Sequence, residues 1–330
     1  MRINICLISD ENFVQHLAVT MASILSNADN DDDLHFYLLL SEDVSEINKQ
    51  KILNLKKIKN CNINFVNVNV SAFKNYALKK RAANYKFMLA NILKDLDKVL
   101  YLDCDLIVLS SLKDLFSTNI DNYYIAAVED YGYYYLNLHL DYHITDFYVN
   151  TGVLLINLDL WRKNNLAEKF ITIKEKSAKN FVFVDQDVIN LCCINKIKNL
   201  PLEYNFQHDF FEVNRKFRYH PLNNKIKSVK NKKIIHYTTP DKPWKAYCPA
   251  MKYYYKFLKM TDFKINITFS LVTIIILSYV KYIFKSILYF IAFILSPIIN
   301  IYKRKSFVKI KLFGFLEFNL FKIKNKYLKY

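Results

Sequence analysis

The chain has 330 residues, of which 52% are hydrophobic, and a formal net charge of +17. It is long enough for one large domain or two ordinary ones with a buried core. Because glycine occurs only 3 times, and neither a Walker motif nor Gly-x-Gly-x-x-Gly is present, glycine-rich phosphate loops are excluded. Any bound nucleotide would be held by carboxylates, a metal ion and side chains.

The positive charge is concentrated at the C-terminal end. Residues 251–330 carry 15 Lys and Arg against 2 Asp and Glu, whereas residues 1–250 carry 32 against 28. A nearly balanced globular domain, 1–250, is therefore expected before a basic, apolar region, 251–330. This asymmetry indicates a surface partner for the tail. Nucleic acid is not expected, because the charge lies among apolar and aromatic residues and no nucleic-acid-binding motif is present.

From the N-terminus, apolar segments typical of buried strands alternate with helical patterns. Ser41 is a candidate N-cap for the second helix. This order predicts a mainly parallel sheet with helices on both faces. The expected strands are 3–9, 34–40, 62–70, 98–109, 125–129 and 153–157, and the expected helices are 13–26, 41–58, 85–96, 160–177 and 185–192.

The six cysteines show no metal-finger spacing, and the N-terminus reads as a first strand without the features of a signal peptide. We therefore expect a reduced, cytoplasmic compartment. The adjacent Cys192 and Cys193 are better explained as two buried small residues than as a redox pair.

Two carboxylates interrupt the apolar segment 99–109, which reads VLYLDCDLIVL. Asp103 and Asp105 are one residue apart, so in a strand they share one face. Burying a charge is costly unless it is compensated, and a divalent cation, which takes oxygen ligands, is the simplest compensation. The alternative is a strand that ends in a polar turn.

Near the C-terminus, 265–280 and 286–302 are strongly apolar and are separated by Lys281 and Lys285. Each is about 16 residues long, short of the roughly 20 that a spanning helix needs, and a basic run from Lys303 to Lys305 follows. This composition predicts a helical segment lying in an anionic membrane interface. A re-entrant hairpin, one true span, or a helical subdomain packed on the core are the alternatives.

Four further segments accompany the acidic pair in a fixed order. They are Ser9 to Asn12, Asn150 to Leu158 with Trp161 and Arg162, Asp185 to Asp187, and His236 to Trp244. Together the five motifs resemble glycosyltransferase family 8, which holds retaining, metal-dependent enzymes of the GT-A fold that use nucleotide sugars. The bacterial members that build lipopolysaccharide or lipooligosaccharide cores are most alike. The resemblance covers roughly residues 1–250, and the basic, aromatic tail is similar to the membrane-attaching ends of such enzymes.

The resemblance implies Asp103, Asp105 and His236 as ligands of Mn²⁺ or Mg²⁺, and imidazole favours Mn²⁺. For His236 alone, the alternative is a core histidine. Nucleotide-sugar contacts are implied for Asp10, Asn12, Lys86, Asp103, Cys104, Asp105, Asn150 and Lys242. The alternatives are a helix N-cap for Asp10 and a turn residue for Asn150.

The family pattern also implies catalytic roles for Asp185 and Gln186. Asp185 would hold sugar hydroxyls, with a helix N-cap as its alternative. Gln186 would lie near the anomeric carbon, as nucleophile or as stabiliser. No second glutamate stands out as a nucleophile, so the resemblance implies front-face attack, with the departing phosphate accepting the acceptor's proton. Asp130 is a candidate acceptor contact.

Two positions depart from the family pattern. Lys86 stands where the family usually has Arg, which removes the bidentate fork, and Thr239 stands where it usually has Gly. The expected activity is transfer of glucose or galactose from a UDP-sugar to a lipid-linked saccharide, at the cytoplasmic face of the bacterial inner membrane. The enzyme would be peripheral or monotopic there. A non-catalytic relative that binds sugar nucleotide or glycan is the alternative that these departures motivate.

Overall fold

The computed structural model describes residues 1–68, 82–132, 148–177, 181, 183–212, 222–264, 269–295, 299–304, 307–312 and 316–322. The chain divides into two compact units, Met1–Thr268 and Phe269–Tyr330. Each unit is described by itself.

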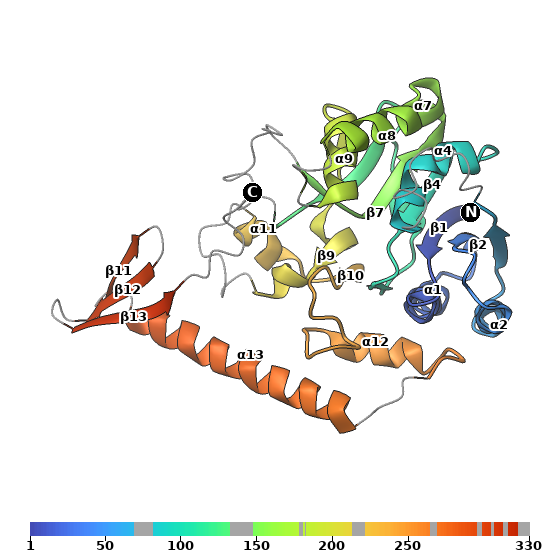
Figure 1. The fold of residues 1–330 in the computed structure, drawn as a ribbon. Coiled ribbons are helices and arrows are strands. Elements are labelled where there is room, and N and C mark those ends of the chain that lie inside the picture. Colours follow the sequence, from blue (N-terminus) through green and yellow to red (C-terminus); the bar gives the residue numbers. More distant parts are fainter. Residues whose placement is uncertain are drawn as a thin grey trace. The chain divides into compact units, whose positions relative to one another are not determined.

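A seven-stranded sheet with the order β3-β2-β1-β4-β7-β6-β8 is the centre of the first unit (Figure 1). The four neighbouring strands β3, β2, β1 and β4 are parallel to one another, whereas β7 is antiparallel to both of its neighbours. The predicted mixed, mainly parallel sheet is therefore confirmed. The strands are β1 (Arg2–Ser9), β2 (Asp33–Leu40), β3 (Asn62–Val66), β4 (Lys98–Leu102), β6 (Ile125–Glu129), β7 (Val149–Asn157) and β8 (Ile197–Asn199).

Helices cover both faces of this sheet (Figure 1). Alternate residues of β1 enter two different cores: Ile5 and Leu7 pack in one, and Cys6 and Ile8 in the other. A strand buried on both faces has a continuous apolar sequence, which is why β1 was recognisable. The first core contains α1 (Val14–Asn27), α2 (Glu46–Leu53) and α12 (Met251–Leu258), and the second contains α4 (Leu89–Ile92), α7 (Leu158–Lys163), α8 (Leu166–Ser177) and α9 (Val184–Cys193).

Several predicted boundaries are wrong. The second helix begins after Ser45, whose hydroxyl accepts from the Asn48 N–H, so Ser45 and not Ser41 is the N-cap. The expected helix 85–96 is mainly the 3-10 helix η3 (Ala82–Met88), followed by α4. The expected helix 160–177 is two helices, because Asn165 between them has a left-handed φ of 52°.

The acidic segment is also not one strand. After β4 the chain leaves the large sheet, and β5 (Leu106–Val108) pairs antiparallel with β10 (Ile234–His236). Strand β10 in turn pairs with β9 (Phe206–Gln207). The Thr20 hydroxyl of α1 lies 3.0 Å from the Cys104 carbonyl and 2.8 Å from that of Leu106. Asp103 and Asp105 therefore lie where the chain switches sheets.

Short elements complete the first unit: α5 (Lys113–Phe116), α11 (Asn223–Ser228), and the 3-10 helices η1 (Asn54–Lys57), η4 (Leu202–Asn205) and η5 (His208–Glu212). The unit runs past residue 250 because α12 packs on α1, where the Tyr254 hydroxyl lies 2.7 Å from His16 Nδ1.

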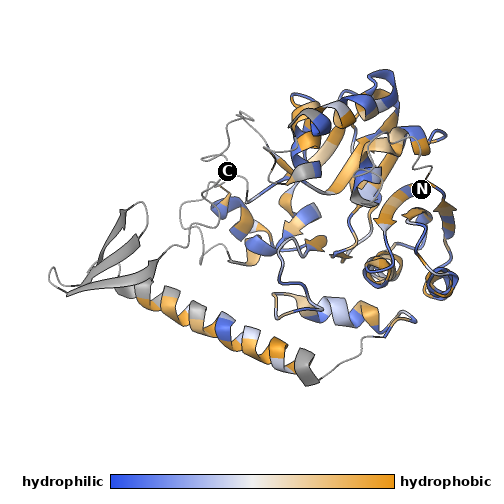
Figure 2. Ribbon diagram, viewed as in Figure 1, coloured by the Kyte–Doolittle hydropathy of each residue, from blue (hydrophilic) through white to orange (hydrophobic). Residues whose placement is uncertain are grey.

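The second unit begins with one continuous helix, α13 (Phe269–Leu295), which runs through Lys281 and Lys285. An antiparallel meander follows it, where the tail was expected to be helical. Its strands are β11 (Ile299–Arg304), β12 (Phe307–Leu312) and β13 (Leu316–Lys322). Apolar residues recur along α13 (Figure 2), and many, such as Ile276 and Leu277, are exposed. Among the described residues, none of the helices combines the length and apolarity that crossing a membrane requires.

One buried histidine of the first unit makes folding stability depend on pH. The His16 ring stacks on Trp244, with centroids 3.5 Å apart. Burial lowers the pKa of His16 from 6.5 to about 4, and Lys245 and Lys242 add to this while Asp105 opposes it. The unfolded chain therefore binds this proton at a higher pH than the folded chain does.

We predict that the free energy of unfolding falls as the pH is lowered from about 6.5 to about 4, with His16 contributing about 3 kcal/mol. In His16→Gln this contribution is absent, so the fall is shallower by about that amount. Denaturant unfolding of both proteins at pH 7 and at pH 4 measures the difference. Equal pH dependence in the two proteins would show that His16 is not the responsible group.

Candidate active site

The acidic pair and His236 meet at the point where the two sheets join. The Asp103 N–H donates to the Gly152 carbonyl at 2.8 Å, and the Tyr237 N–H donates to the Asp105 carbonyl at 3.0 Å. His236 Nε2 consequently lies 3.1 Å from Asp105 Oδ1 and 3.8 Å from Asp103 Oδ2. One ligand atom from each of the three residues lies within 4.8 Å of the others. We call Asp103, Asp105 and His236 the triad.

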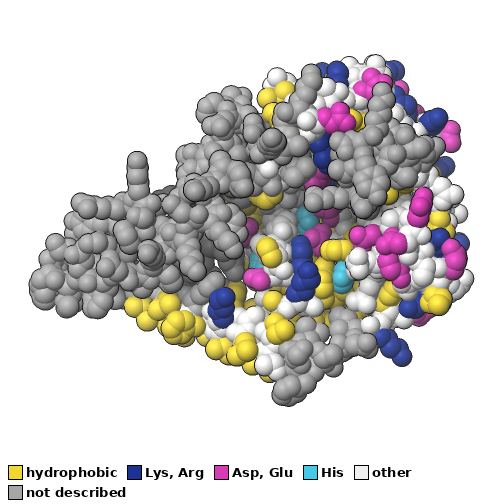
Figure 3. All heavy atoms as spheres, viewed as in Figure 1, with side chains coloured by type: hydrophobic (Ala, Val, Ile, Leu, Met, Phe, Trp, Pro, Cys, Tyr) yellow, Lys and Arg dark blue, Asp and Glu magenta, His cyan; other side chains and the backbone are white. Residues whose placement is uncertain are grey.

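Lys242 adds a positive charge to the triad. Its ammonium lies 2.5 Å from Asp105 Oδ2 and also donates to the Tyr237 carbonyl. Burial alone would raise the pKa of Asp105, but His236 and Lys242 hold that pKa well below its usual range. Asp105 is therefore held as an anion, with the His236 ring against one of its oxygens and the Lys242 ammonium against the other. Figure 3 shows acidic, histidine and basic side chains near one another on one face of the molecule.

A buried lysine joins the triad to helix α9. Lys86 is only 2% exposed, and its ammonium lies 3.0 Å from Asp185 Oδ2 and 3.7 Å from Asp103 Oδ1. It also donates to the Thr151 carbonyl and lies over the Tyr101 ring. Burial lowers the pKa of Lys86, but the charges of Asp103 and Asp185 outweigh this and raise it. Lys86 is therefore a permanent cation between two carboxylates.

His236 is oriented from behind by two buried amides. The Asn205 side-chain nitrogen donates to Asn150 Oδ1 at 2.9 Å, which turns the Asn205 oxygen to His236 Nδ1 at 3.0 Å. Because the Asn205 oxygen can only accept, Nδ1–H donates to it, and Nε2 is the ring nitrogen that faces the carboxylates of the triad. Such a partner fixes the tautomer and ring orientation of a metal-ligating histidine.

The same network reaches Gln186. The Asn150 amide donates to Asp130 Oδ2 at 3.0 Å, and Gln186 Nε2 donates to the same oxygen at 3.1 Å. The Gln186 oxygen accepts from the Thr151 N–H at 3.1 Å. The candidate acceptor residue Asp130 is thus buried and bridges Asn150 and Gln186, whereas its contact with an acceptor stays a prediction.

Helix α9 is anchored by Asp187 and not by Asp185. The Phe183 N–H donates to Asp187 at 2.8 Å, and the Tyr148 hydroxyl donates to the other Asp187 oxygen. Phe183 is the N-cap residue, so the alternative that Asp185 is an N-cap is wrong. Asp185 is left in the first turn, one-third exposed and paired with Lys86.

The remaining predicted contacts lie at the end of β1. Asp10 Oδ1 accepts from the Phe13 N–H at 3.1 Å, directly before α1, although Phe13 is itself the N-cap residue. Because Leu7 pairs with Leu102, Asp10 and the exposed Asn12 follow β1 where Asp103 follows β4. The Cys104 thiol donates to the Ile8 carbonyl and is buried, so its side chain is committed to the fold. Nucleotide contacts of these residues stay predictions.

Two residues of the site had no assigned role in the sequence. A Cβ on Gly152 would lie 2.1 Å from His236 Cε1 and 2.8 Å from Asp103 Oδ2, so only glycine fits against the triad. Because the chain has only 3 glycines, a glycine inside this motif was a usable signal. Asn205 lies in η4 and carried no signal of its own. Thr239, the other departure, lies 2.7 Å from His208 Nδ1 through its hydroxyl.

A mainly parallel sheet with an acidic pair at the exit of its central strand defines a glycosyltransferase of the GT-A type. The model of glycosyl transferase family 8 matches residues 4–248, and the chain belongs to this family. It is therefore a glycosyltransferase.

Individual relatives agree with the family. A putative glycosyltransferase of Haemophilus influenzae is 30% identical over 256 residues, which cover 74% of each chain. A lipopolysaccharide 1,2-glucosyltransferase of Escherichia coli is 33% identical over 158 residues, 45% of each chain. The galactosyltransferase LgtC, solved with donor and acceptor sugar analogs, superposes with a TM-score of 0.68 at 24% identity, covering 81% of this chain and 98% of LgtC. At that identity the likeness shows the fold.

We predict that Gly152→Ala abolishes the geometry of the triad. The added methyl overlaps the His236 ring, so His236 and Asp103 must separate, and affinity for a divalent cation falls by about 10- to 100-fold. Titration of Mn²⁺ followed by electron paramagnetic resonance measures this. Asp95→Ala, which removes an exposed carboxylate outside the triad, is the control. Unchanged Mn²⁺ affinity in Gly152→Ala would refute the arrangement.

Proposed function

We propose that this chain is a retaining, metal-dependent hexosyltransferase. It moves glucose or galactose from a UDP-sugar to a lipid-linked saccharide such as a lipopolysaccharide or lipooligosaccharide core. The observation that carries the proposal is the triad, whose three ligand atoms lie within 4.8 Å beside Lys242. The names of the relatives from Haemophilus influenzae and Escherichia coli support the reaction class and a saccharide acceptor.

The donor atoms of the triad fit a divalent cation. Two carboxylates and a histidine with its Nδ1 engaged by Asn205 offer oxygen and imidazole ligands, a set that suits Mn²⁺ better than Mg²⁺. Gly152 leaves no side chain over them. Such an ion, when bound, would neutralise charge on the diphosphate leaving group.

Two lysines of the chain complement a diphosphate and a sugar. Lys242 lies beside Asp105 on a segment after β10, where a point charge can contact phosphate oxygens. Lys86 donates to Asp185 Oδ2 at 3.0 Å, which orients this carboxylate while its side chain stays one-third exposed. Asp185 is thereby positioned to accept from sugar hydroxyls, and Asp10, Asn12 and Asn150 complete the proposed donor site.

The amide of Gln186 supports a stabilising role. Its nitrogen is held by Asp130 and its oxygen accepts from the Thr151 N–H. An amide fixed at both ends places a dipole at a defined point, which is how preorganised sites stabilise developing charge. A nucleophile would have to release one of these bonds. We therefore favour front-face attack, in which the departing phosphate accepts the acceptor's proton.

A membrane location accompanies this acceptor. The second unit presents exposed apolar residues along α13, and the chain beyond residue 250 carries 15 Lys and Arg against 2 acidic residues. Apolar burial and attraction to anionic lipid together support interfacial binding. We place the enzyme at the cytoplasmic face of the bacterial inner membrane.

The alternative is a relative that binds sugar nucleotide without turnover, motivated by Lys86 and Thr239. Lys86 nevertheless retains a cation between Asp103 and Asp185, and the Thr239 hydroxyl is engaged by His208. Both departures are accommodated by partners, which favours the catalytic proposal.

We expect slow, Mn²⁺-dependent release of UDP from one nucleotide sugar in the absence of acceptor. Removing one ligand in Asp103→Ala or Asp105→Ala should lower this rate by about 100-fold or more. The control is Asp95→Ala, which changes an exposed carboxylate. Assays of a donor panel with all four proteins make the measurement. If no donor releases UDP and none binds with Mn²⁺, the transferase proposal fails; binding without release, with or without saccharide acceptors, supports the non-catalytic relative.

A chain that ends at Lys264 is expected to be mostly soluble, since it retains all but the last four residues of the first unit and lacks α13 and the strands after it. Sedimentation with bacterial membranes in low and high salt compares it with the full chain. The full chain should pellet in both conditions because part of its binding is apolar. A shortened chain that still pellets in both would show that the tail is not the anchor.

A further inference from the structure

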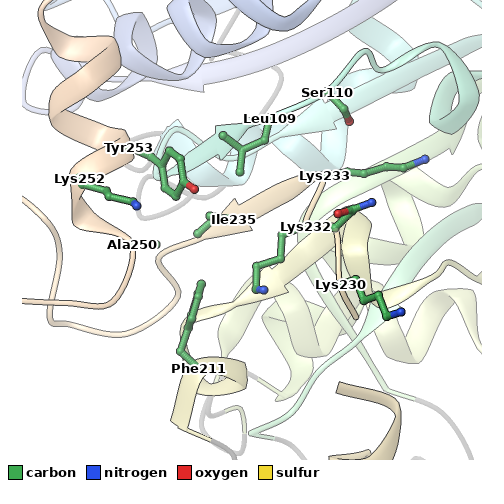
Figure 4. A pocket seen from close by; sticks show the side chains of 11 residues that line it. Leu109, Ser110, Phe211, Lys230, Lys232, Lys233, Ile235, Ala250, Lys252 and Tyr253 are labelled. Carbon is green, nitrogen blue, oxygen red and sulfur yellow. The ribbon is translucent and has the colours of Figure 1, made fainter. Parts of the chain in front are cut away.

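A second recess lies outside the site described above. It has a volume of about 700 Å³ and lies between the segment that precedes β10 and helix α12. Figure 4 shows Lys252 on one side and Lys230, Lys232 and Lys233 on the other, with Phe211 and Tyr253 contributing rings. We call it the basic pocket.

The basic pocket and the triad lie on opposite faces of one strand. Successive side chains of a strand point to opposite sides. His236 of β10 belongs to the triad, whereas its neighbour Ile235 lines the basic pocket. A ligand in the basic pocket would therefore not occupy the triad, and the function of this pocket is independent of the proposed transfer reaction.

Among the described residues, most of the charges of the basic pocket have no acidic counterpart. None of the residues that line it is acidic. Lys233 donates to the Tyr204 hydroxyl at 2.8 Å and lies 3.6 Å from Asp114. Within the described part of the chain, the other three lysines have no carboxylate partner, and Lys232 instead lies 4.6 Å from the centroid of the Phe206 ring.

The local sequence reinforces this imbalance. Between Leu222 and Lys233 the chain carries five lysines and no acidic residue. Like charges that surround a recess repel one another and raise the local concentration of anions. Three ammonium groups without a carboxylate partner around one recess are thus best stabilised by a multivalent anion, and lysine is a common phosphate ligand.

We propose that the basic pocket binds a phosphate-bearing group, such as the headgroup of an acidic phospholipid or a small soluble phosphate ester. The lysines would contact the phosphate oxygens as point charges. The rings of Phe211 and Tyr253, with Ile235, would contact the carbon skeleton that carries the phosphate.

The test uses the full chain and two triple variants with equal charge changes. The pocket variant is Lys230→Gln, Lys232→Gln and Lys252→Gln. The control is Lys56→Gln, Lys94→Gln and Lys169→Gln, three exposed lysines without ion pairs among the described residues. Binding is measured by sedimentation with phosphatidylcholine vesicles that contain phosphatidylglycerol, and by calorimetric titration with glycerol 3-phosphate.

The pocket variant should lose about fivefold in affinity for each lysine removed, on the order of 100-fold in total, while the control variant stays near wild type. A loss with vesicles alone identifies lipid as the source of the phosphate, and a loss with glycerol 3-phosphate identifies a soluble ester. Equal binding by the pocket and control variants to both probes overturns the proposal. Lys230→Gln and Lys252→Gln, both at exposed residues, repeat the test singly if the triple variant fails to fold. Acceptor-independent UDP release should be unchanged in all of them, which separates this test from that of the proposed function.

Discussion

The site depends on keeping carboxylates charged in a largely buried place. Asp103 and Asp105 lie where the chain leaves the main sheet, and burial by itself would favour the protonated form of Asp105. His236 and Lys242, six residues apart in the chain, oppose this at Asp105, and Lys86 from a separate part of the chain lies 3.7 Å from Asp103. The fold therefore has to bring η3, β10 and the segment after β10 to one point. This requirement explains why the small sheet β5-β10-β9 is built directly on the exit of β4.

A second constraint is space. β7 runs antiparallel beside β4, and the Gly152 carbonyl accepts from the Asp103 N–H. A side chain at Gly152 would overlap His236, so the close approach of strand and imidazole exists only because glycine is there. The preceding residues of β7 then act at the same edge: Asn150 supports His236 through Asn205, and Thr151 binds Lys86 through its carbonyl and Gln186 through its N–H. Three consecutive residues, Asn150 to Gly152, thus connect the triad to Lys86 and Gln186.

The sequence was most informative where a residue's role follows from local pattern. Buried parallel strands have continuous apolar sequences, so β1, β2 and β6 were found at nearly their observed bounds. The acidic pair was recognised because carboxylates in an apolar segment are unusual, whereas His236 was added to it by the resemblance to glycosyltransferase family 8. What depends on tertiary packing was not predictable: the sheet switch between Asp103 and Asp105, the positive φ at Asn165, and the 3-10 conformation around Lys86. Asn205 was missed because its importance lies only in the two side chains that it joins by hydrogen bonds, Asn150 and His236.

Because the network is continuous, the two ends of the site cannot change independently. Asn150 accepts from Asn205 and from the Gly152 N–H, and donates to Asp130, which also holds Gln186. A shift of His236 on binding a cation would be transmitted through Asn205 to the amide of Asn150. The carboxylate of Asp130 would then have to follow or lose a hydrogen bond, and an unpaired buried polar group costs about 1–3 kcal/mol. Such a cost is large enough to keep Gln186 aligned with the triad. The buried amides would thereby couple occupation of the triad to the orientation of Gln186, the residue proposed to lie nearest the reacting sugar.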